Sequence, residues 1–106
     1  MRWIYHLTTP SAWRIADAAY RAPSLDTEGF IHCSNQDQVA RVANLFYAAE
    51  PELLVLCIDA NLLTSPLRDE DAGGGETFPH VHGAINREAI REVRRLNRTA
   101  DGTWVY

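Results

Sequence analysis

The chain has 106 residues, a formal net charge of −4, and a composition of 46% hydrophobic and 23% charged residues. This length accommodates one domain with one modest core, so we expect residues 1–106 to form a single domain, as a monomer or small homo-oligomer. The composition is that of a globular protein and excludes disorder and low complexity. No segment approaches the roughly 20 apolar residues of a membrane span, and the N-terminus lacks the apolar core of a signal peptide, which predicts a cytoplasmic protein without a membrane partner.

Arginine is concentrated near the C-terminus. Residues 86–106 contain five arginines and three acidic residues, whereas residues 1–85 contain five arginines and eleven acidic residues. An acidic chain without a broad basic stripe is not typical of proteins that bind duplex nucleic acid. We therefore predict no duplex partner and a solvated surface around these arginines, which are Arg87, Arg91, Arg94, Arg95 and Arg98.

The N-terminal third predicts a strand, a helix and a second strand. Residues 2–8 alternate between two faces, which is the period of a strand. Thr9 supplies a capping hydroxyl before a proline at the first helical position, and apolar residues then recur at helical spacing, so we expect a helix over Pro10–Tyr20. Arg21–Glu28 contains a proline and precedes a glycine, which predicts a loop leading to a strand over Phe30–Cys33.

The middle of the chain predicts a second helix and a buried strand. Ser34 and Asp37 have the spacing of a capping box, and the apolar stripe that follows ends at Phe46. Leu53–Ile58 is short and continuously apolar, which predicts a strand buried on both faces at the centre of the sheet.

The C-terminal part predicts loops and a closing hairpin. Arg68–Gly75 is acidic and then glycine-rich, so we expect an exposed, mobile loop. Asn86 can cap a short helical turn, and Val93–Asn97 with Thr103–Tyr106 suggests an antiparallel pair. The pattern as a whole indicates an α+β domain of short strands with two helices near the N-terminus.

Both cysteines, Cys33 and Cys57, lie inside apolar, strand-like runs. Two cysteines are too few for a disulfide framework, so we expect buried, reduced thiols. Cys33 lies between His32 and Ser34, but side chains alternate along a strand, so it would point away from both and is not favoured as a nucleophile.

All four histidines fall in three short, strand-like segments. The segments are Tyr5–Thr8, Gly29–Ser34 and Glu76–Gly83, and the histidines are His6, His32, His80 and His82. Imidazole transfers protons, binds metals and forms hydrogen bonds to ribose or phosphate near neutral pH. This concentration predicts a functional site.

Two kinds of hydrolytic site are consistent with the histidines alone. His80 and His82 are two residues apart and would share one face of a strand, so with His6 or His32 they could ligate a metal in a metal-dependent hydrolase. The triplets His6-Leu7-Thr8 and His32-Cys33-Ser34 resemble those of two-histidine phosphoesterases, in which one histidine acts as base and the other as acid.

A third interpretation includes Glu76, which follows the glycine run. A histidine on the first strand, a hydroxyl on the second and a glutamate on a later one resemble the pattern of ADP-ribosyltransferase-like domains. That resemblance implies that His6 grips a ribose hydroxyl, that Ser34 with His32 occupies the second-strand position, and that Glu76 stabilises an oxocarbenium-like centre as nicotinamide leaves.

Three segments resemble the bacterial family called domain of unknown function 952: residues 4–8, 26–34 and 75–83. The resemblance covers nearly the whole chain. It implies an α+β protein of ADP-ribosyltransferase-like fold, with a cleft between two small sheets of short mixed or antiparallel strands. The family usually has a tyrosine where this chain has His82.

The combined hypothesis is a cleft that binds a nucleotide-like small molecule, with NAD as the expected cofactor. The expected catalytic residues are Glu76, His80 and His6, where His80 orients the substrate or acts as acid or base. The expected cofactor-binding residues are His6, Thr8, His32, Ser34 and His82. The enzymatic form of the hypothesis is ADP-ribosyl transfer or NAD hydrolysis, and the alternative is a non-catalytic ligand-binding or sensor protein on the same fold.

Overall fold

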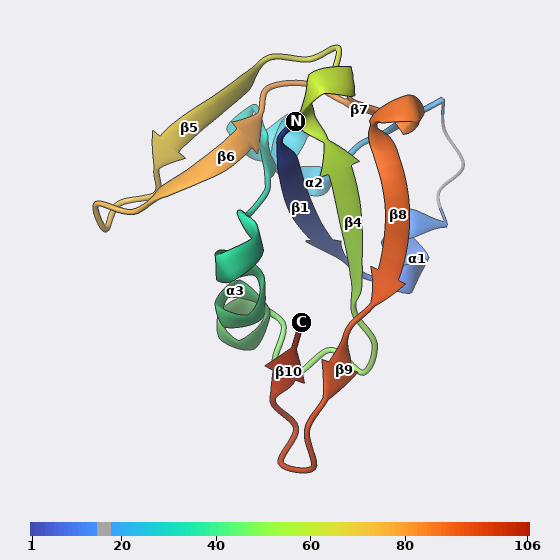
Figure 1. Ribbon diagram of the computed structural model, residues 1–106, viewed down its shortest axis with the longest axis vertical. Helices are drawn as coiled ribbons and strands as arrows, with labels where there is room; N and C mark the ends of the chain where they lie inside the picture. The colour runs from blue at the N-terminus through green and yellow to red at the C-terminus, as the bar shows by residue number, and fades with distance from the viewer. Residues whose placement is uncertain (15–17) are drawn as a thin grey trace.

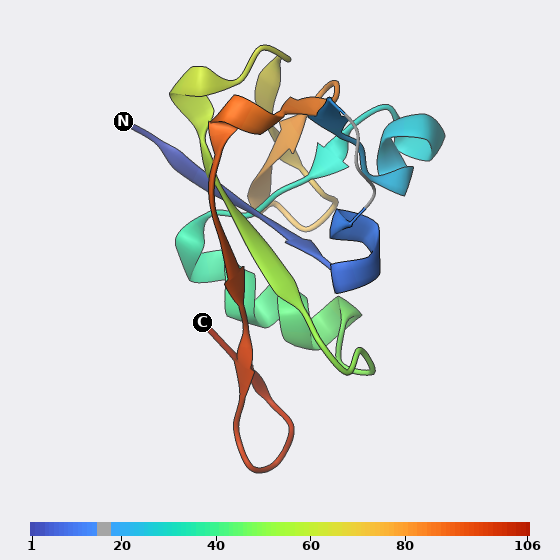
Figure 2. The same cartoon turned by 90° about the vertical axis from the view of Figure 1, so that its right-hand side faces the viewer.

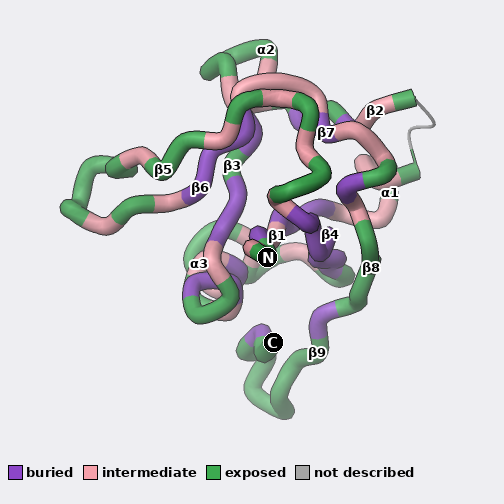
Figure 3. Tube along the Cα trace, turned by 45° about the horizontal axis from the view of Figure 1, so that its top comes forward, coloured by how far each residue is buried: buried purple, intermediate pink, exposed green. Residues whose placement is uncertain are grey.

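The centre of the fold is a three-stranded antiparallel sheet in which β4 (Leu54–Asp59) lies between β1 (Trp3–Thr8) and β8 (Ile90–Arg95) (Figure 1). Every residue of β4 is buried, whereas β8 at the edge of the sheet is mostly exposed (Figure 3). The prediction of a buried central strand over Leu53–Ile58 is therefore confirmed, because a continuous apolar run can be covered on both faces.

The computed structural model describes residues 1–14 and 18–106. In this part of the chain three smaller antiparallel sheets surround the central one, with strand orders β3-β6-β5, β2-β7 and β10-β9. Their strands are β2 (Ala19–Tyr20), β3 (Ile31–His32), β5 (Leu67–Asp71), β6 (Thr77–Val81), β7 (Ile85–Asn86), β9 (Asn97–Arg98) and β10 (Trp104–Val105). The helices are α1 (Pro10–Trp13), α2 (Pro23–Glu28) and α3 (Val39–Phe46), and the 3-10 turns are η1 (Gln36–Gln38), η2 (Ala60–Leu62) and η3 (Arg87–Ala89).

Alternate residues of β4 contribute to two hydrophobic clusters on opposite faces of the central sheet. Leu56 and Ile58 pack in a cluster with the small sheets, for example with Val81 of β6. Val55, together with Leu53 just before the strand, packs in the other cluster, which is closed by α3 and by β10. Figure 2 shows α3 running along this second face of the sheet.

The predicted helix over Pro10–Tyr20 is only partly correct. It begins as predicted, because Pro10 is the first helical residue and the Thr9 side chain accepts the backbone N–H of Ala12 at 3.3 Å. It ends at Trp13, and Ala19–Tyr20 instead pair with β7. The buried Tyr20 hydroxyl is bonded to side chains of β1, so a tertiary contact determines the conformation there. Residues 15–17 of the predicted helix lie outside the described residues.

The predicted loop over Arg21–Glu28 is wrong. Pro23–Glu28 form α2, in which the proline occupies the first helical position, where its missing N–H costs nothing. Gly29 ends this helix with a left-handed φ of 87°. The proline and the glycine were interpreted as loop residues, but they are the start and stop signals of a short helix.

The next two predictions are nearly correct. The strand predicted over Phe30–Cys33 is present as the two-residue β3, and the predicted cap at Ser34 is wrong by one residue, because Asn35 is the cap. Asn35 and Gln38 form the capping box, so η1 precedes α3, which ends at Phe46 as predicted.

The predicted mobile loop over Arg68–Gly75 is wrong over its first half, which forms β5 and pairs with β6. The hairpin turn follows, where the carboxylate of Asp71 accepts the backbone N–H groups of Gly73 at 2.7 Å and of Gly75 at 3.0 Å. The closing hairpin is also displaced, because Ile90–Arg95 pair with β4 and only the short β9 pairs with β10. No helix in the described part of the chain is long and apolar enough to cross a membrane.

Candidate functional site

A pocket with a volume of about 490 Å³ opens between α3, the end of β1 and the sheet β3-β6-β5. Its apolar lining residues are Leu7, Val42, Phe46, Tyr47, Ala72 and Phe78. The other lining residues are His32, Cys33, Ser34 and His80. This volume is typical of small-molecule sites, as are the apolar lining and the few convergent polar groups.

His80 is the most unusual side chain of the pocket. It is only 4% exposed, and its ring stacks on Phe30 with a centroid distance of 4.1 Å and an interplanar angle of 14°. Its Nδ1 lies 2.9 Å from Oε1 of Glu70. Its Nε2 is buried and has no hydrogen-bond partner among the described residues. An unpartnered buried polar atom costs free energy, so such atoms are rare outside functional sites.

Glu70 is a site residue that sequence analysis missed. Its Oε1 accepts hydrogen bonds from Nδ1 of His80 at 2.9 Å and from Nε2 of His82 at 2.7 Å. These two bonds, the one from His82 first, hold the pKa of the Glu70 carboxyl below its ordinary value. Glu70 was assigned to a mobile loop. The signal that could have placed it was the glycine run between two five-residue segments, which indicates a hairpin.

His6 is not among the residues that line the pocket. Its ring is buried, and both nitrogens are used: Nδ1 donates to the carbonyl of His32 at 2.6 Å, and Nε2 lies 2.9 Å from the Tyr20 hydroxyl. That hydroxyl also bonds Oγ1 of the buried Thr8 at 3.0 Å. Desolvation lowers the pKa of His6 from 6.5 to about 4, so the ring is neutral at pH 7. Contact of His6 or Thr8 with a ribose would require these bonds to break.

His32 and Ser34 do line the pocket. His32 is half-exposed, and its Nε2 lies 3.0 Å from Oε2 of Glu28, while its ring meets that of His80 edge to face at 5.3 Å. Ser34 is buried and exchanges two backbone hydrogen bonds with Tyr5, at 2.7 Å and 2.9 Å. The second-strand residues His32 and Ser34 therefore both line the pocket.

Glu76 lies at the tip of the β5–β6 hairpin and faces α3. Its Oε2 accepts a hydrogen bond from Nε2 of Gln38 at 2.8 Å and forms an ion pair with Arg41. It is not among the residues that line the pocket. The carboxylate thus links the hairpin, which contributes Phe78 and His80 to the pocket, to the helix that contributes Val42 and Phe46.

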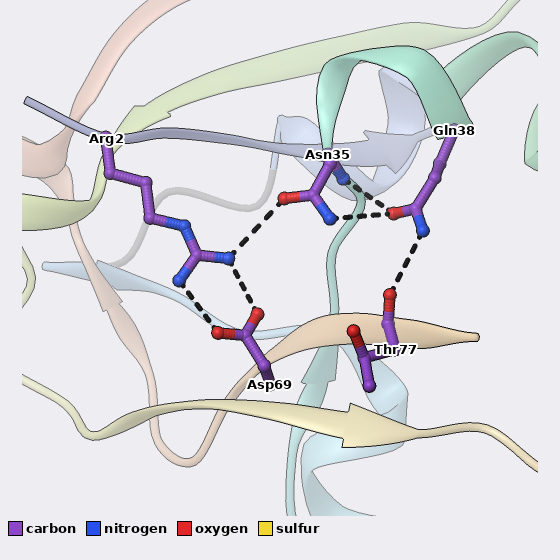
Figure 4. Close-up of polar contacts among 5 residues, drawn as sticks. All are labelled: Arg2, Asn35, Gln38, Asp69 and Thr77. Atoms are coloured by element: carbon purple, nitrogen blue, oxygen red, sulfur yellow. Dashed lines mark hydrogen bonds and ion pairs between the residues drawn. The ribbon is translucent and has the colours of Figure 1, made fainter. Parts of the chain in front are cut away.

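A polar network that also includes Gln38 joins the same hairpin to Arg2 and to η1 (Figure 4). The Arg2 guanidinium donates to both carboxylate oxygens of Asp69, at 2.6 Å and 3.0 Å, and contacts Asn35 at 3.4 Å. Asn35 bonds Gln38, whose amide donates to the carbonyl of Thr77 at 3.0 Å. These contacts join the start of β1, η1 and both strands of the hairpin, so the pocket has a preorganised frame.

The remaining chemical groups have local partners. Among the described residues, no three histidine, cysteine or acidic side chains are arranged to hold a metal ion, and the pair suggested as ligands, His80 and His82, shares Glu70 instead. Both cysteines are buried and form no disulfide, as predicted, and Sγ of Cys57 lies 3.5 Å from the Tyr106 hydroxyl. Burial raises the pKa of the Cys33 thiol far above its ordinary value. Cys33 is therefore a poor nucleophile.

The family model described as "Protein of unknown function (DUF952)" matches residues 7–93. The chain belongs to this family. The match to DUF952 runs from Leu7, near the end of β1, to Val93 in β8, and it includes all the pocket residues. No curated protein matches the chain.

Solved structures of one protein share the DUF952 chain's fold. The crystal structure of protein CC0527 from Caulobacter crescentus is 24% identical, with a TM-score of 0.86 over 97% of this chain and 93% of that one. Its solution NMR structure is 26% identical, with a TM-score of 0.81 over 96% and 90% of the two chains. These similarities establish the α+β fold, and their descriptions name no activity.

Proposed function

We propose that this protein binds a small, planar, nucleotide-like molecule in the pocket beside α3, and that NAD is the first ligand to test. The observation that carries the proposal is the buried, unpartnered Nε2 of His80 in the wall of a preorganised pocket of about 490 Å³. Phe46, Tyr47 and Phe78 supply aromatic surface on which a base or pyridine ring can pack.

The residues have different roles in this proposal. His32, Ser34 and His80 contact the ligand, because they line the pocket. His6, with Thr8 behind it, is a positioning residue that holds the main chain of His32 through the 2.6 Å hydrogen bond. His82 is a positioning residue that shares Glu70 with His80.

The enzymatic form of the proposal is ADP-ribosyl transfer or NAD hydrolysis on an ADP-ribosyltransferase-like fold in the cytoplasm. It requires Glu76 to leave Arg41 and turn toward the ligand, where its carboxylate would stabilise positive charge on the ribose. The non-catalytic form, a ligand-binding or sensor protein, requires no such movement. The geometry favours the non-catalytic form, because Glu76 is already bonded to two groups of the η1–α3 segment.

The test is an NMR titration of the full chain with NAD, following backbone amides. We expect saturable shifts at His32, Ser34 and Phe78, which lie in the pocket. Phe46→Ala removes a ring from the pocket lining and should weaken NAD binding. Leu45→Ala is the matched control and should leave binding unchanged, because Leu45 is 64% exposed but does not line the pocket. The absence of saturable shifts at millimolar NAD would refute the proposal.

The same titration separates the two forms. Glu76→Gln keeps the side-chain shape but removes the charge. If released nicotinamide is detected with the natural chain, this variant should abolish release and retain most binding. If no nicotinamide is released while NAD binds, the protein is the binding form.

A further inference from the structure

We infer that a small aromatic phosphate, a single ring that bears a phosphate group, binds in a second pocket on one face of the central sheet. This pocket has a volume of about 240 Å³ and is lined by residues of β1, η1, β4 and β8 and by Tyr106. Among the described residues, it shares none of its lining with the pocket beside α3. The inference therefore goes beyond the proposed function and does not depend on it.

The first step is the position of Arg91 on β8. The two strands pair residue by residue as far as Glu92, which is opposite Cys57, but the next pair is Ile90 with Ile58. Arg91 is therefore the extra residue of a β-bulge, a device that re-aims a side chain. In regular register Arg91 would be opposite Ile58 and would point to the other face of the sheet from Cys57. It instead lines this pocket together with Cys57.

The second step is the set of hydrogen-bond donors that the pocket offers. Arg91 is exposed and has no hydrogen-bond or ion-pair partner among the described residues. Arg94, which also lines the pocket, uses only its Nε in an ion pair with Glu92. Its two terminal nitrogens have no acceptor in the described part of the chain. Two guanidinium groups are thus available, and guanidinium N–H donors match the oxygens of a phosphate.

The third step is the acidic groups around this pocket. Glu92 lines it but is paired with Arg94. Asp59, which is opposite Trp3 in register, is buried, and its carboxylate accepts the backbone N–H that begins η2 at 3.0 Å. Asp37 follows a lining residue of η1 but is exposed and does not line the pocket itself. The groups that can contact an anion are therefore the arginine donors.

The fourth step is the aromatic surface. Trp3, Tyr5 and Tyr106 line the same pocket, and Trp3 and Tyr106 are 40% and 43% exposed. Tyr106 has a defined position, because its ring meets that of Tyr5 at a centroid distance of 5.7 Å and its hydroxyl lies 3.5 Å from Sγ of Cys57. Such rings provide surface on which a planar ligand can pack.

The size of the pocket limits the ligand. A volume of about 240 Å³ is smaller than that of most sites for drug-sized molecules, so it suits one ring with its phosphate and excludes a dinucleotide.

The test is an NMR titration of the full chain with phenyl phosphate, inorganic phosphate and phenol near pH 7.5. We expect saturable shifts for the indole N–H of Trp3 and for the backbone amide of Arg91. Phenyl phosphate should bind at least about fivefold more tightly than either other probe, because it alone uses both the rings and the guanidinium groups. Added salt should weaken its binding.

Arg91→Gln and Arg95→Gln form the matched pair of variants. Each removes one positive charge from an exposed position of β8, but Arg95 contacts Glu52 and does not line the pocket. Arg91→Gln should weaken the binding of phenyl phosphate at least about fivefold, and Arg95→Gln less than about twofold. Trp3→Leu removes the exposed ring and should reduce the affinity for phenyl phosphate to that for inorganic phosphate.

The outcomes separate this inference from the proposed function. Absence of shifts at millimolar phenyl phosphate, an equal loss of affinity in the two arginine variants, or equal affinities for phenyl phosphate and inorganic phosphate would each overturn it. Shifts confined to Ser34 and Phe78 would place the probe in the pocket beside α3 and would also overturn it. None of these results bears on NAD binding beside α3, and a failure of NAD to bind there leaves this second site unaffected.

Discussion

The buried ring of His6 makes the stability of this protein depend on pH in a defined direction. His6 is 5% exposed, donates to the carbonyl of His32 and bonds the Tyr20 hydroxyl. Desolvation of the charged form is the main reason that its pKa falls from 6.5 to about 4, and the nearby His32 ring adds to the effect, while the hydrogen bond to the His32 carbonyl opposes it.

The sign follows from the protons that each state binds. Between pH 6.5 and pH 4 the unfolded chain protonates its histidine, whereas the folded chain keeps His6 neutral, so acid favours the unfolded state. The stabilising contribution is fully present above pH 6.5 and is lost as the pH falls toward 4. At about 1.4 kcal/mol per pH unit, the total loss is about 3 kcal/mol, of which about 2 kcal/mol falls between pH 7 and pH 4.5.

The assay is urea denaturation at pH 7 and pH 4.5 of the natural chain and of His6→Asn. Asparagine can donate to the His32 carbonyl but does not titrate, so the variant should lose about 2 kcal/mol less of its free energy of unfolding between the two pH values. Carboxylates with lowered pKa values, such as Glu70, also lose stabilisation in acid, but they do so in both chains and cancel in the comparison. An equal pH dependence in the two chains would refute the assignment of a buried neutral His6.

Two further substitutions test the fold by the same denaturation assay. Gly83 has a φ of 155°, and a Cβ there would lie 2.4 Å from Oγ of Ser65, so Gly83→Ala should lower the free energy of unfolding by about 1–3 kcal/mol. A Cβ at Gly74 meets nothing within 4 Å, so the control Gly74→Ala should change this free energy by less than about 0.5 kcal/mol. Similar values for both variants would contradict this packing. The Asn44 side chain on α3 forms hydrogen bonds with both the backbone N–H (2.8 Å) and the carbonyl (3.0 Å) of Trp104. Asn44→Ala should therefore lower the free energy of unfolding by about 1–3 kcal/mol. An unchanged free energy of unfolding would show that β10 is not held by α3.

The elements that sequence predicted correctly are those determined by local pattern. The apolar run Leu53–Ile58 can only be buried, and the pair Thr9-Pro10 starts a helix regardless of what packs against it. The elements that it missed are determined by partners distant in the chain. Tyr20 is in a strand because its hydroxyl bonds side chains of β1, which no spacing around residue 20 could indicate.

The β5 strand shows why charged residues are a poor guide to loops. Its residues Arg68–Asp71 were interpreted as a mobile segment because the segment is acidic. They nevertheless form a strand, because ion pairs and hydrogen bonds hold its side chains in place of an apolar face. Asp69 pairs with Arg2 at the opposite end of the sequence, and Glu70 bonds two histidines across the sheet. The partners that stabilise this strand lie in β6 or directly beside β1 and β6, so the charges became informative only once the register was known.

The same reasoning explains why four histidines that looked equivalent in the sequence have four different sets of hydrogen-bond partners. His6 uses both ring nitrogens inside the protein and is neutral, and His32 keeps one nitrogen near an exposed Glu28. His82 donates Nε2–H to Glu70, while His80 donates Nδ1–H to the same oxygen and leaves Nε2 without a partner. Under the proposed function, what distinguishes a positioning histidine from a ligand-contacting one is the partner of each ring nitrogen. The sequence groups the four histidines into three segments, but only the pairing of β5 with β6 brings Glu70 to His80 and His82.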